Sequence, residues 1–525
     1  MSKTFLTNLE AQQKLFEGVN KVANIVKLTL GPKGRNVVLD RKYATPLITN
    51  DGATIAKEFE VENNYENMGV KLIKEVCLKT NDIAGDGTTT AMVIAQKMLE
   101  EGLKQIFNGV SPIKINKGIN KAINFCIEHL QKISKKISNN TELEHIASIS
   151  SQNKQIGKLI ADIYVKLGKT NNIVLQDSKT NKTEVVFQEG ISFEKGFVSP
   201  FLCNTPEKDK TIFDDCYVLL TDKKINSFNE LLPIFEQILK ENKPLLIICD
   251  DINDETLSSI IVNKMHGTFN CCVVRAPLFG EKKLAVLEDI AALTNTKVFT
   301  QAENDNLGVL TLSNLGKLKQ AKITKDSTTL IAKEVDENKL NLRKKIIQTQ
   351  IENCQNAFDK EQLKNRLANL CGGIATIYVG ANTEIEQQEL KLRIEDAISA
   401  TSSALEQGIV AGGGIALLKL VNPLKAFIKT LKSEEKIGGE IVLNVLNAPL
   451  KQILLNADKE PILILNKILK SKKQNYGFDA MNDKFCNMIE CGIIDPTKVT
   501  ITALTNATSI VTTMLTTQGL LTDKE

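Results

Sequence analysis

One segment, residues 81–91 with the sequence NDIAGDGTTTA, combines residue types that suit binding of a phosphate with a metal ion. Asp86 is followed by Gly87 and three threonines, and an apolar run begins at Ala91. This pattern predicts a loop that leads into a helix, whose first amides attract anions. A carboxylate suits such a place when a divalent cation lies between it and the phosphate. The alternative is an ordinary helix N-cap, although a cap needs only one of the three threonines.

Two further stretches could bring the backbone close to an anion. They are Thr29-Leu30-Gly31-Pro32 and Gly412-Gly413-Gly414, because glycine lets main-chain amides approach a ligand. A helix C-cap at Gly31 and a close helix crossing at the triple glycine are the structural alternatives. The chain contains neither G-x-x-x-x-G-K-[ST] nor a G-x-G-x-x-G after a strand, so the two common nucleotide-binding motifs are not indicated.

Three carboxylates are candidates for joint action. Asp51 lies in the turn signal Asn50-Asp51-Gly52, Asp86 precedes a predicted helix, and Asp396 lies within a predicted amphipathic helix. The usual role of a carboxylate on such a helix is to face solvent. Spacing along the chain does not bring these three residues together, so their grouping depends on the fold.

Composition limits the classes of protein that this chain can belong to. Its 525 residues predict two to four domains. A net charge of +4, from 66 basic and 62 acidic residues, indicates neither a nucleic-acid partner nor a membrane partner. The eleven cysteines form no C-x-x-C and there are three histidines, so we expect free buried thiols and no zinc site.

The N-terminal 21 residues predict a polar amphipathic helix with neither a signal-peptide nor a transit-peptide pattern. No apolar stretch reaches the ~18 residues that span a bilayer. We therefore expect a cytoplasmic protein without a membrane partner.

The elements that must position the candidate residues change in character along the chain. The first ~130 residues predict helices at 64–84, 88–108 and 113–134, with strands at 36–40 and 46–49 that place Asp51 at a hairpin tip. Residues 170–330 alternate short apolar runs (173–175, 217–220, 245–248, 272–274 and 297–299) with helical patterns (228–241 and 254–266). A helical pair follows at 337–370, broken near 358–359, and helices return from 384. This order predicts a discontinuous helical domain around an inserted α/β unit.

These segments carry a family resemblance over nearly the whole chain. The matching stretches, in family order, are LTLGPKGRNVVLD (28–40), ITNDGATIAKE (48–58), ENMGVKLIKEV (66–76), NDIAGDGTTTAMVIAQ (81–96), KPLLII (243–248), LCGGIATIYVGANTE (370–384), RIEDAISAT (393–401), VAGGGIALL (410–418) and NMIECGIIDPTKVT (487–500). In these motifs the chain resembles a group I chaperonin of the GroEL type.

The resemblance implies a multidomain α/β fold with a mostly helical equatorial ATPase domain at 1–132 and 407–525. It implies an intermediate hinge domain at 133–188 and 373–406, and an α/β apical domain at 189–372. It further implies an ATPase that encloses unfolded client proteins in seven-subunit rings, two of them stacked, with a GroES-type co-chaperonin as lid. ATP, Mg²⁺ and K⁺ are the implied cofactors.

The resemblance also implies roles for residues that match the family's motifs. Asp51 and Asp396 would position and activate the attacking water, with Asp396 as the general base. Asp86 would bind magnesium, and main-chain oxygens at Thr29 and Asn50 would hold potassium. The implied nucleotide contacts are Thr29, Leu30, Gly31, Pro32, Asn50, Asp86, Gly87, Thr88, Thr89, Thr90, Gly413, Asp479, Ala480, Met481 and Asp495.

Client and co-chaperonin binding is implied for an apolar surface of the apical domain. Its matching residues are Phe197, Val198, Ser199, Phe201, Leu202, Leu232, Phe235, Leu257, Ile261 and Val262. Leu232 with Phe235, and Leu257 with Ile261, have spacings that share a helix face. From spacing alone a core stripe is the more usual interpretation of such faces. The resemblance further implies a hinge at Gly372-Gly373 and ring–ring contacts at Lys451 and Glu460.

Two other functions remain open from the sequence. A small-molecule kinase would need an acceptor-site motif, and the sequence offers none. A scaffold that kept the fold but lost ATPase activity is disfavoured, because Asp51, Asp86 and Asp396 are all present.

Overall fold

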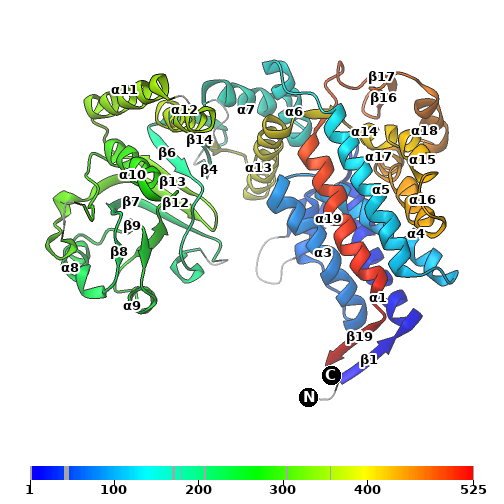
Figure 1. Ribbon diagram of the computed structural model, residues 1–525, viewed down its shortest axis with the longest axis horizontal. Coiled ribbons are helices and arrows are strands. Elements are labelled where there is room, and N and C mark those ends of the chain that lie inside the picture. The colour runs from blue at the N-terminus through cyan, green and yellow to red at the C-terminus, as the bar shows by residue number, and fades with distance from the viewer. Residues whose placement is uncertain are drawn as a thin grey trace. The chain divides into compact units, whose positions relative to one another are not determined.

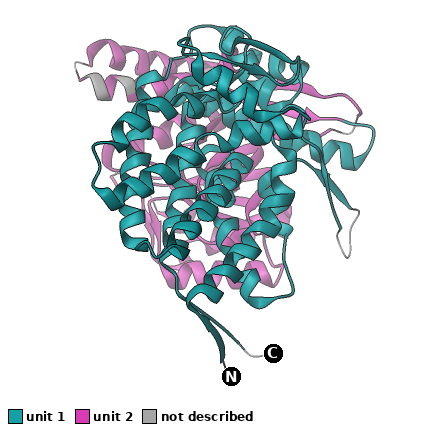
Figure 2. Ribbon diagram, turned by 90° about the vertical axis from the view of Figure 1, so that its right-hand side faces the viewer, with its two compact units in different colours: residues 1–162, 381–525 teal, residues 163–380 magenta. Residues whose placement is uncertain are grey.

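The computed structural model of the chain describes residues 3–40, 46–167, 172–178, 180–205, 208–302, 306–354 and 356–523. Two compact units divide it (Figure 2). Unit 1 contains residues 1–162 and 381–525, and unit 2 contains residues 163–380. Unit 2 is thus inserted between the two segments of unit 1, as the predicted order of elements requires. No helix among the described residues is long and apolar enough to cross a bilayer.

Unit 1 is mainly helical. Its helices are α1 (Asn8–Val26), α2 (Gly52–Glu58), α3 (Asn64–Ala84), α4 (Thr88–Phe107), α5 (Pro112–Ile133), α6 (Asn140–Ser151), α13 (Glu384–Gln407), α14 (Ile415–Lys419), α15 (Val421–Ile428), α16 (Ser433–Val445), α17 (Ala448–Asn456), α18 (Pro461–Lys470) and α19 (Thr497–Thr516), while α7 (Lys154–Leu167) leads into unit 2. Its strands form antiparallel pairs, which are β1 (Lys3–Thr7) with β19 (Gly519–Asp523), β2 (Val37–Leu39) with β3 (Leu47–Thr49), β15 (Ile409–Ala411) with β18 (Ile494–Pro496), and β16 (Tyr476–Asp479) with β17 (Lys484–Asn487).

The core of unit 1 joins the two ends of the chain. Helix α19 packs against α3, α4 and α5 (Figure 1). The apolar side chains of α4 recur at Ala91, Ala95 and Met98, the spacing of one helix face, and all three are buried in this core. Burial of such faces, rather than helix propensity, supplies most of the stability of a helix bundle.

Unit 2 is an α/β unit built on a six-stranded sheet. The strand order is β11-β9-β7-β12-β13-β6, with parallel pairing on the β11-β9-β7 side and antiparallel pairing from β7 to β6. The sheet strands are β6 (Gly190–Phe193), β7 (Lys210–Leu220), β9 (Leu245–Cys249), β11 (Cys271–Arg275), β12 (Gly316–Thr324) and β13 (Thr328–Ala332). All of β9 and the first four residues of β11 are buried, which is typical of strands covered on both faces.

Smaller sheets and further helices complete the described part of unit 2. Strands β4 (Ile173–Asp177), β14 (Ile374–Val379) and β5 (Glu184–Gln188) form a three-stranded sheet, and β8 (Lys224–Ile225) pairs with β10 (Asp251–Ile252). The helices are α8 (Leu232–Glu241), α9 (Asp254–Met265), α10 (Gly280–Thr294), α11 (Glu337–Asn353) and α12 (Ala357–Gly372).

One buried carboxylate ties three of these helices together. Asp289 of α10 accepts hydrogen bonds from Arg343 of α11 at 2.6 Å and from Arg366 of α12 at 2.7 Å, measured from Nε. Its side chain is 1% exposed. A carboxylate so far from water is tolerated because it is paired with guanidinium groups, and loss of either arginine would leave buried charge uncompensated.

The structure confirms the predicted fold class and most long elements. The predicted helices at 64–84, 88–108 and 113–134 and the strands at 173–175, 217–220, 245–248 and 272–274 lie within one or two residues of α3, α4 and α5 or inside β4, β7, β9 and β11. The β2–β3 hairpin is also confirmed.

Four local predictions were wrong. The predicted N-terminal helix starts later than expected, because residues 3–7 pair with residues 519–523 as strand β1 and the helix, α1, begins only at Asn8. Asp51 caps helix α2 instead of lying at a hairpin tip. Residues 297–299 form no strand; Phe299 makes an isolated bridge to Thr221. The break in the helical pair falls between Asn353 and Ala357, before the predicted site.

Candidate functional site

Asp86 lies in the short loop between α3 and α4, as the sequence predicts. Helix α3 ends at Gly85 with φ 66°, and α4 begins after Gly87 with φ 81°. Both values lie in the left-handed region, where glycine is favoured. A Cβ at Gly87 would lie only 2.5 Å from a methyl carbon of Val499, so the position also lacks room for a side chain.

The Asp86 carboxylate is held by two donors. Its Oδ1 accepts a hydrogen bond from the Gly87 amide at 2.5 Å, and its Oδ2 accepts one from the Ser150 hydroxyl of α6 at 3.2 Å. Burial raises the pKa of Asp86, the two hydrogen bonds oppose that rise, and the charge of Asp51 adds to it. The carboxylate is thus oriented, partly withdrawn from water and close to a second negative charge.

Ser150 is the contact of Asp86 that sequence reasoning missed. It lies in the sequence HIASISSQ near the end of α6, where a serine is unremarkable. Only the packing of α6 beside the Asp86 loop identifies it.

Three threonine- and glycine-bearing segments converge at the start of α4. The hydroxyl of Thr29 lies 3.3 Å from that of Thr89 and also donates to the Val26 carbonyl at 2.9 Å. A Cβ at Gly52 would lie 2.5 Å from the Thr89 hydroxyl. The segments 29–32, 50–52 and 87–90, far apart in sequence, therefore meet at one helix N-terminus.

Asp51 is placed in this group by its role as a helix cap. Its Oδ1 accepts from the Ala53 amide at 3.0 Å, and its Oδ2 accepts from the amide and hydroxyl of Thr54 at 2.8 and 2.6 Å. These bonds fix the carboxylate at the start of α2. A carboxylate that is already fixed can orient a water molecule without a further entropy cost for ordering its side chain.

Asp396 reaches the same place from the far end of the chain. Helix α13 packs on the Asp86 loop, because Ser403 donates to the Ala84 carbonyl at 3.1 Å and a Cβ at Gly85 would overlap Ser399. Asp396 lies one turn before Ser399 on this helix.

Asp396 is close enough to Asp86 and Asp51 to be affected by their charges. Burial, followed by the charges of Asp86 and Asp51, holds the pKa of Asp396 well above its ordinary value. The residue is half-buried rather than on a solvated helix face. The fold therefore brings together the three carboxylates that spacing alone left separate.

A fourth carboxylate, Asp495, lies beside the triple glycine. Strand β18 pairs Asp495 with Val410, and a Cβ at Gly412 would lie 2.8 Å from the Asp495 carboxylate. Burial raises the pKa of Asp495 to about 7, aided by the charge of Asp86 and opposed by a hydrogen bond from the Gly413 amide. Gly413 has φ 63° and so aims this amide in a way few other residues could.

Asp479 ends strand β16, and its side chain is engaged in the following turn. The carboxylate accepts from the amides of Met481 and Asn482 at 3.0 and 3.1 Å and from the Asn482 side chain at 2.8 Å. Ala480 is buried, and the Met481 side chain is exposed. The Met481 side chain thus faces solvent, and the Asp479 carboxylate holds the backbone of the turn through the two amides.

The described residues contain no cluster of three or more His, Cys, Asp and Glu that could hold a metal by themselves. A magnesium ion held by one carboxylate together with phosphate oxygens does not require such a cluster. The oxygen-only character of Asp86, Thr88 and Thr89 fits a hard cation of this kind.

The residues predicted to bind clients in unit 2 divide by exposure. Phe201, Leu232 and Val262 are exposed, with 56%, 41% and 51% of their surfaces accessible. Phe197, Val198, Leu257 and Ile261 are half-buried against the core of the unit, and Ser199 caps a short helical turn.

Leu202 and Phe235 do not lie on this surface. They are 0% and 2% exposed, and the Phe235 ring stacks on Phe269 with centroids 4.3 Å apart. The expectation that Leu232 and Phe235 present one common face to a client is therefore wrong for this conformation. Leu232 and Phe235 lie three residues apart on α8, yet the first side chain is exposed and the second is buried in the core.

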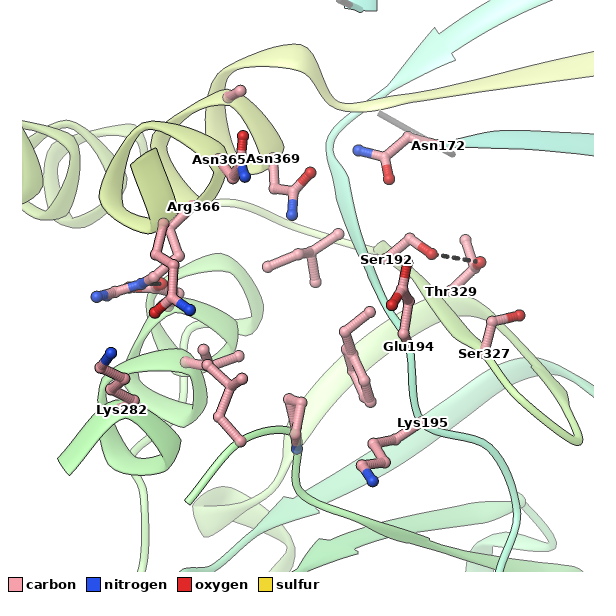
Figure 3. A pocket seen from close by; sticks show the side chains of 18 of the residues that line it. Asn172, Ser192, Glu194, Lys195, Lys282, Ser327, Thr329, Asn365, Arg366 and Asn369 are labelled. Atoms are coloured by element: carbon pink, nitrogen blue, oxygen red, sulfur yellow. Dashed lines mark hydrogen bonds and ion pairs between the residues drawn. The ribbon is translucent and has the colours of Figure 1, made fainter. Parts of the chain in front are cut away.

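Unit 2 also contains a pocket of about 810 Å³ that sequence reasoning did not predict. Figure 3 shows Asn365, Arg366 and Asn369 of α12 on one side and Ser192 of β6, hydrogen-bonded to Thr329, on the other. None of the residues predicted to bind clients is among the described residues that line it.

The inserted architecture is that of a chaperonin fold. The chaperonin gp146 from the bacteriophage EL 2 (Pseudomonas aeruginosa), solved in the presence of ATP-BeFx, shares this fold with a TM-score of 0.73. The two are 20% identical, and the match covers 99% of each chain. The model of the TCP-1/cpn60 chaperonin family matches residues 22–525. The chain belongs to the TCP-1/cpn60 chaperonin family, and its resemblance to GroEL-type chaperonins is confirmed.

Proposed function

We propose that this chaperonin binds and hydrolyses ATP at the start of α4 and uses the hydrolysis cycle to fold unfolded client proteins. The observation that carries the proposal is the meeting of Asp51, Asp86 and Asp396 beside the converging segments 29–32 and 87–90. Carboxylates that lie close together at an anion-attracting helix N-terminus are stabilised when a cation and a polyphosphate bind between them. The chaperonin solved with ATP-BeFx is a member of the same fold and supports the choice of nucleotide.

The proposed nucleotide contacts use main-chain and hydroxyl donors. Residues 29–32 and 87–90 would surround the phosphates, and Asp86 would hold magnesium, whose charge neutralises the developing negative charge of the transferred phosphoryl group. Main-chain oxygens of Thr29 and Asn50 would hold potassium. Gly413, Asp495 and the turn at 479–481 would contact ribose and base.

Asp396 is the proposed general base and Asp51 its partner in orienting water. Asp51 is fixed by three hydrogen bonds at the start of α2, whereas Asp396 has a raised pKa and so takes up a proton more readily than an ordinary aspartate. A base is most effective when its pKa lies near the working pH. We therefore assign removal of the proton from the attacking water to Asp396, and orientation of that water to Asp51.

Clients would bind the exposed apolar residues of unit 2. Phe201, Leu232 and Val262 offer separate apolar contacts on one unit, and repetition of that unit around a ring would multiply a weak contact into stable capture. A GroES-type co-chaperonin would compete for the same residues and close the cavity. Nucleotide binding would shift the ring toward the state that releases the client inside.

The proposed domain division follows the family pattern. The equatorial domain would comprise 1–132 and 407–525, the intermediate domain 133–188 and 373–406, and the apical domain 189–372. Hinge motion at Gly372-Gly373 and seven-subunit rings, stacked in pairs through Lys451 and Glu460, belong to the same proposal.

The test is a paired assay on the purified protein. ATP hydrolysis should require magnesium and increase with potassium, and refolding of a chemically denatured enzyme should require ATP and a co-chaperonin. Hydrolysis without refolding would contradict the chaperonin role. Turnover that depends on a small-molecule acceptor would instead identify a kinase, and binding of clients without hydrolysis would identify a scaffold.

A further inference from the structure

Two thiols meet in the turn that connects β17 to β18. Cys486 is the third residue of β17 and is half-buried, while Cys491 is exposed. The two thiols are close enough to influence each other's ionisation, and the Cys486 sulfur lies 4.0 Å from the Met488 sulfur. Three sulfur atoms are therefore grouped in a segment of six residues.

The backbone of the turn explains why residues five apart come together. The Cys491 amide donates to the Asn487 carbonyl at 2.9 Å, and the Gly492 amide donates to Ile489 at 3.1 Å. Ile493 then donates to Met488 at 2.8 Å and closes the turn. This one coiled turn folds Cys491 back over the end of β17.

Of the other described cysteines, Cys203 and Cys354 are half-buried like Cys486, six are buried and one is exposed. Cys77, Cys126, Cys216, Cys249, Cys271 and Cys272 are buried, where oxidants have no access. Cys371 is exposed and is used here as the control for the reaction of a single exposed thiol.

The turn is joined directly to the proposed nucleotide site. The Gly412 amide donates to the Ile493 carbonyl at 2.9 Å, and a Cβ at Gly413 would touch the Met488 methyl at 3.3 Å. Asp495 follows two residues later and accepts the Gly413 amide. A change in the turn is therefore transmitted to the triple glycine and to Asp495 through single contacts.

We propose that Cys486 and Cys491 are a reversible oxidation site, which a low-molecular-weight disulfide converts to an intramolecular disulfide that lowers ATP turnover. The thiolate of exposed Cys491 attacks one sulfur of the small disulfide, forms a mixed disulfide and expels one small thiol. The Cys486 sulfur then attacks the Cys491 sulfur, loses its proton and expels the second small thiol. Two protein thiols are oxidised and one small disulfide is reduced to two thiols.

The order of attack follows from the environments of the two residues. Burial, together with the neighbouring thiol, raises the pKa of Cys486 to about 12, so this residue carries little thiolate at neutral pH. Cys491 is the accessible member. Cys486 is therefore the slower nucleophile, and it reacts only after the mixed disulfide on Cys491 has formed beside it.

The oxidation half of the proposal is tested by peptide mass spectrometry. The full chain is treated with glutathione disulfide, remaining thiols are blocked with N-ethylmaleimide, and trypsin is added. Residues 485–498 form one tryptic peptide that contains both cysteines, and residues 367–391 form one that contains only Cys371. We expect the first peptide to lose the mass of two hydrogens and to carry no label, and the second to carry glutathione or the label.

Two outcomes would overturn the oxidation site. One is a 485–498 peptide that carries two labels after treatment that modifies Cys371. The other is a stable glutathione adduct on Cys491 with Cys486 still labelled, because that result shows that the second thiol does not resolve the first. In Cys491→Ser the internal disulfide must be absent.

The regulatory half rests on the proposed function, because it needs ATP turnover as its readout. We expect severalfold slower hydrolysis by the oxidised wild type, recovery with dithiothreitol, and no response in Cys491→Ser or Cys486→Ser. A mapped disulfide with unchanged hydrolysis would overturn the regulation. Absence of hydrolysis in the reduced protein would instead overturn the proposed function, while the disulfide map still decides the oxidation site.

Discussion

At the scale of single residues, the site is defined by carboxylates whose environments differ. Asp51 is held by three hydrogen bonds, Asp86 by two, and Asp396 is raised in pKa by burial and by the other two charges. Groups of one chemical type thus acquire separate roles from their surroundings. This separation is the basis for assigning the base to Asp396 and the metal to Asp86.

Replacement of the base should separate binding from chemistry. Asp396→Ala is expected to retain ATP binding and to slow hydrolysis by about 10²- to 10⁴-fold, the usual contribution of a positioned general base. Equilibrium nucleotide binding and steady-state hydrolysis measure the two effects. Glu384→Ala, at an exposed position in the first turn of the same helix, is the control and should hydrolyse normally. Unchanged turnover in Asp396→Ala would refute the assignment.

Asp495 gives a prediction about pH and stability. Its pKa in the folded protein is about 7, above the ordinary value of 3.8. The folded state therefore binds more protons than the unfolded state between about pH 4 and pH 7, and stability contributed by this group falls as the pH rises through that window.

Asp495→Asn removes this loss because the amide does not ionise. The midpoint of thermal unfolding of the variant, relative to wild type, should be higher at pH 8 than at pH 5, while its affinity for ATP should fall. A midpoint difference that is the same at both pH values would show that the Asp495 carboxyl does not titrate in this range.

At the scale of elements, the loop between α3 and α4 depends on glycine at position 87. Gly87→Ala should be destabilised by the left-handed backbone, at a cost of about 1–2 kcal/mol, and further by contact with Val499. Gly109→Ala is the matched control, since Gly109 has φ 86° and no neighbour within 4 Å of an added Cβ. Denaturant unfolding should rank Gly87→Ala below Gly109→Ala, and equal stability would contradict the proposed contact.

Helix α8 offers a second matched pair. Leu232→Ser removes an exposed side chain and should leave stability within about 0.5 kcal/mol while weakening capture of an unfolded protein. Phe235→Ala removes a buried ring and should cost about 3–5 kcal/mol. Thermal unfolding and co-sedimentation with a denatured enzyme measure the two effects. Unchanged capture by a folded Leu232→Ser variant would argue against this client surface.

The elements also show what sequence patterns could and could not predict. Helices α3 and α4 were predicted nearly to the residue, because Asn63 and Gly85 mark the ends of α3 and a threonine run marks the start of α4. Asp51 was misplaced, because the signal Asn50-Asp51-Gly52 suits both a turn and a helix cap. Strand β1 was missed because its partner lies more than 500 residues away.

The candidate site required the fold for the same reason. Thr29 and Thr89 touch across 60 residues, and Asp396 joins them from a different segment of unit 1. Motif resemblance supplied this grouping where periodicity could not. Neither resemblance nor spacing revealed that Phe235 is buried while Leu232 is exposed, because both residues are apolar and lie on one short helix.

At the scale of the whole molecule, each chain supplies one helical unit formed from both ends of the sequence and one inserted α/β unit. Family membership explains this discontinuous arrangement. The exposed apolar residues of unit 2 would bind a client together if many copies of the unit faced a common space. Assembly is therefore the property on which the proposed folding function depends.

Electron microscopy of the purified full chain, with and without ATP, tests this account most directly. We predict rings with sevenfold symmetry, and class averages in which the unit 2 density changes position when ATP is present. Monomers at micromolar concentration under both conditions, or rings whose images are unaffected by ATP, would contradict the proposal that this protein is an ATP-driven chaperonin.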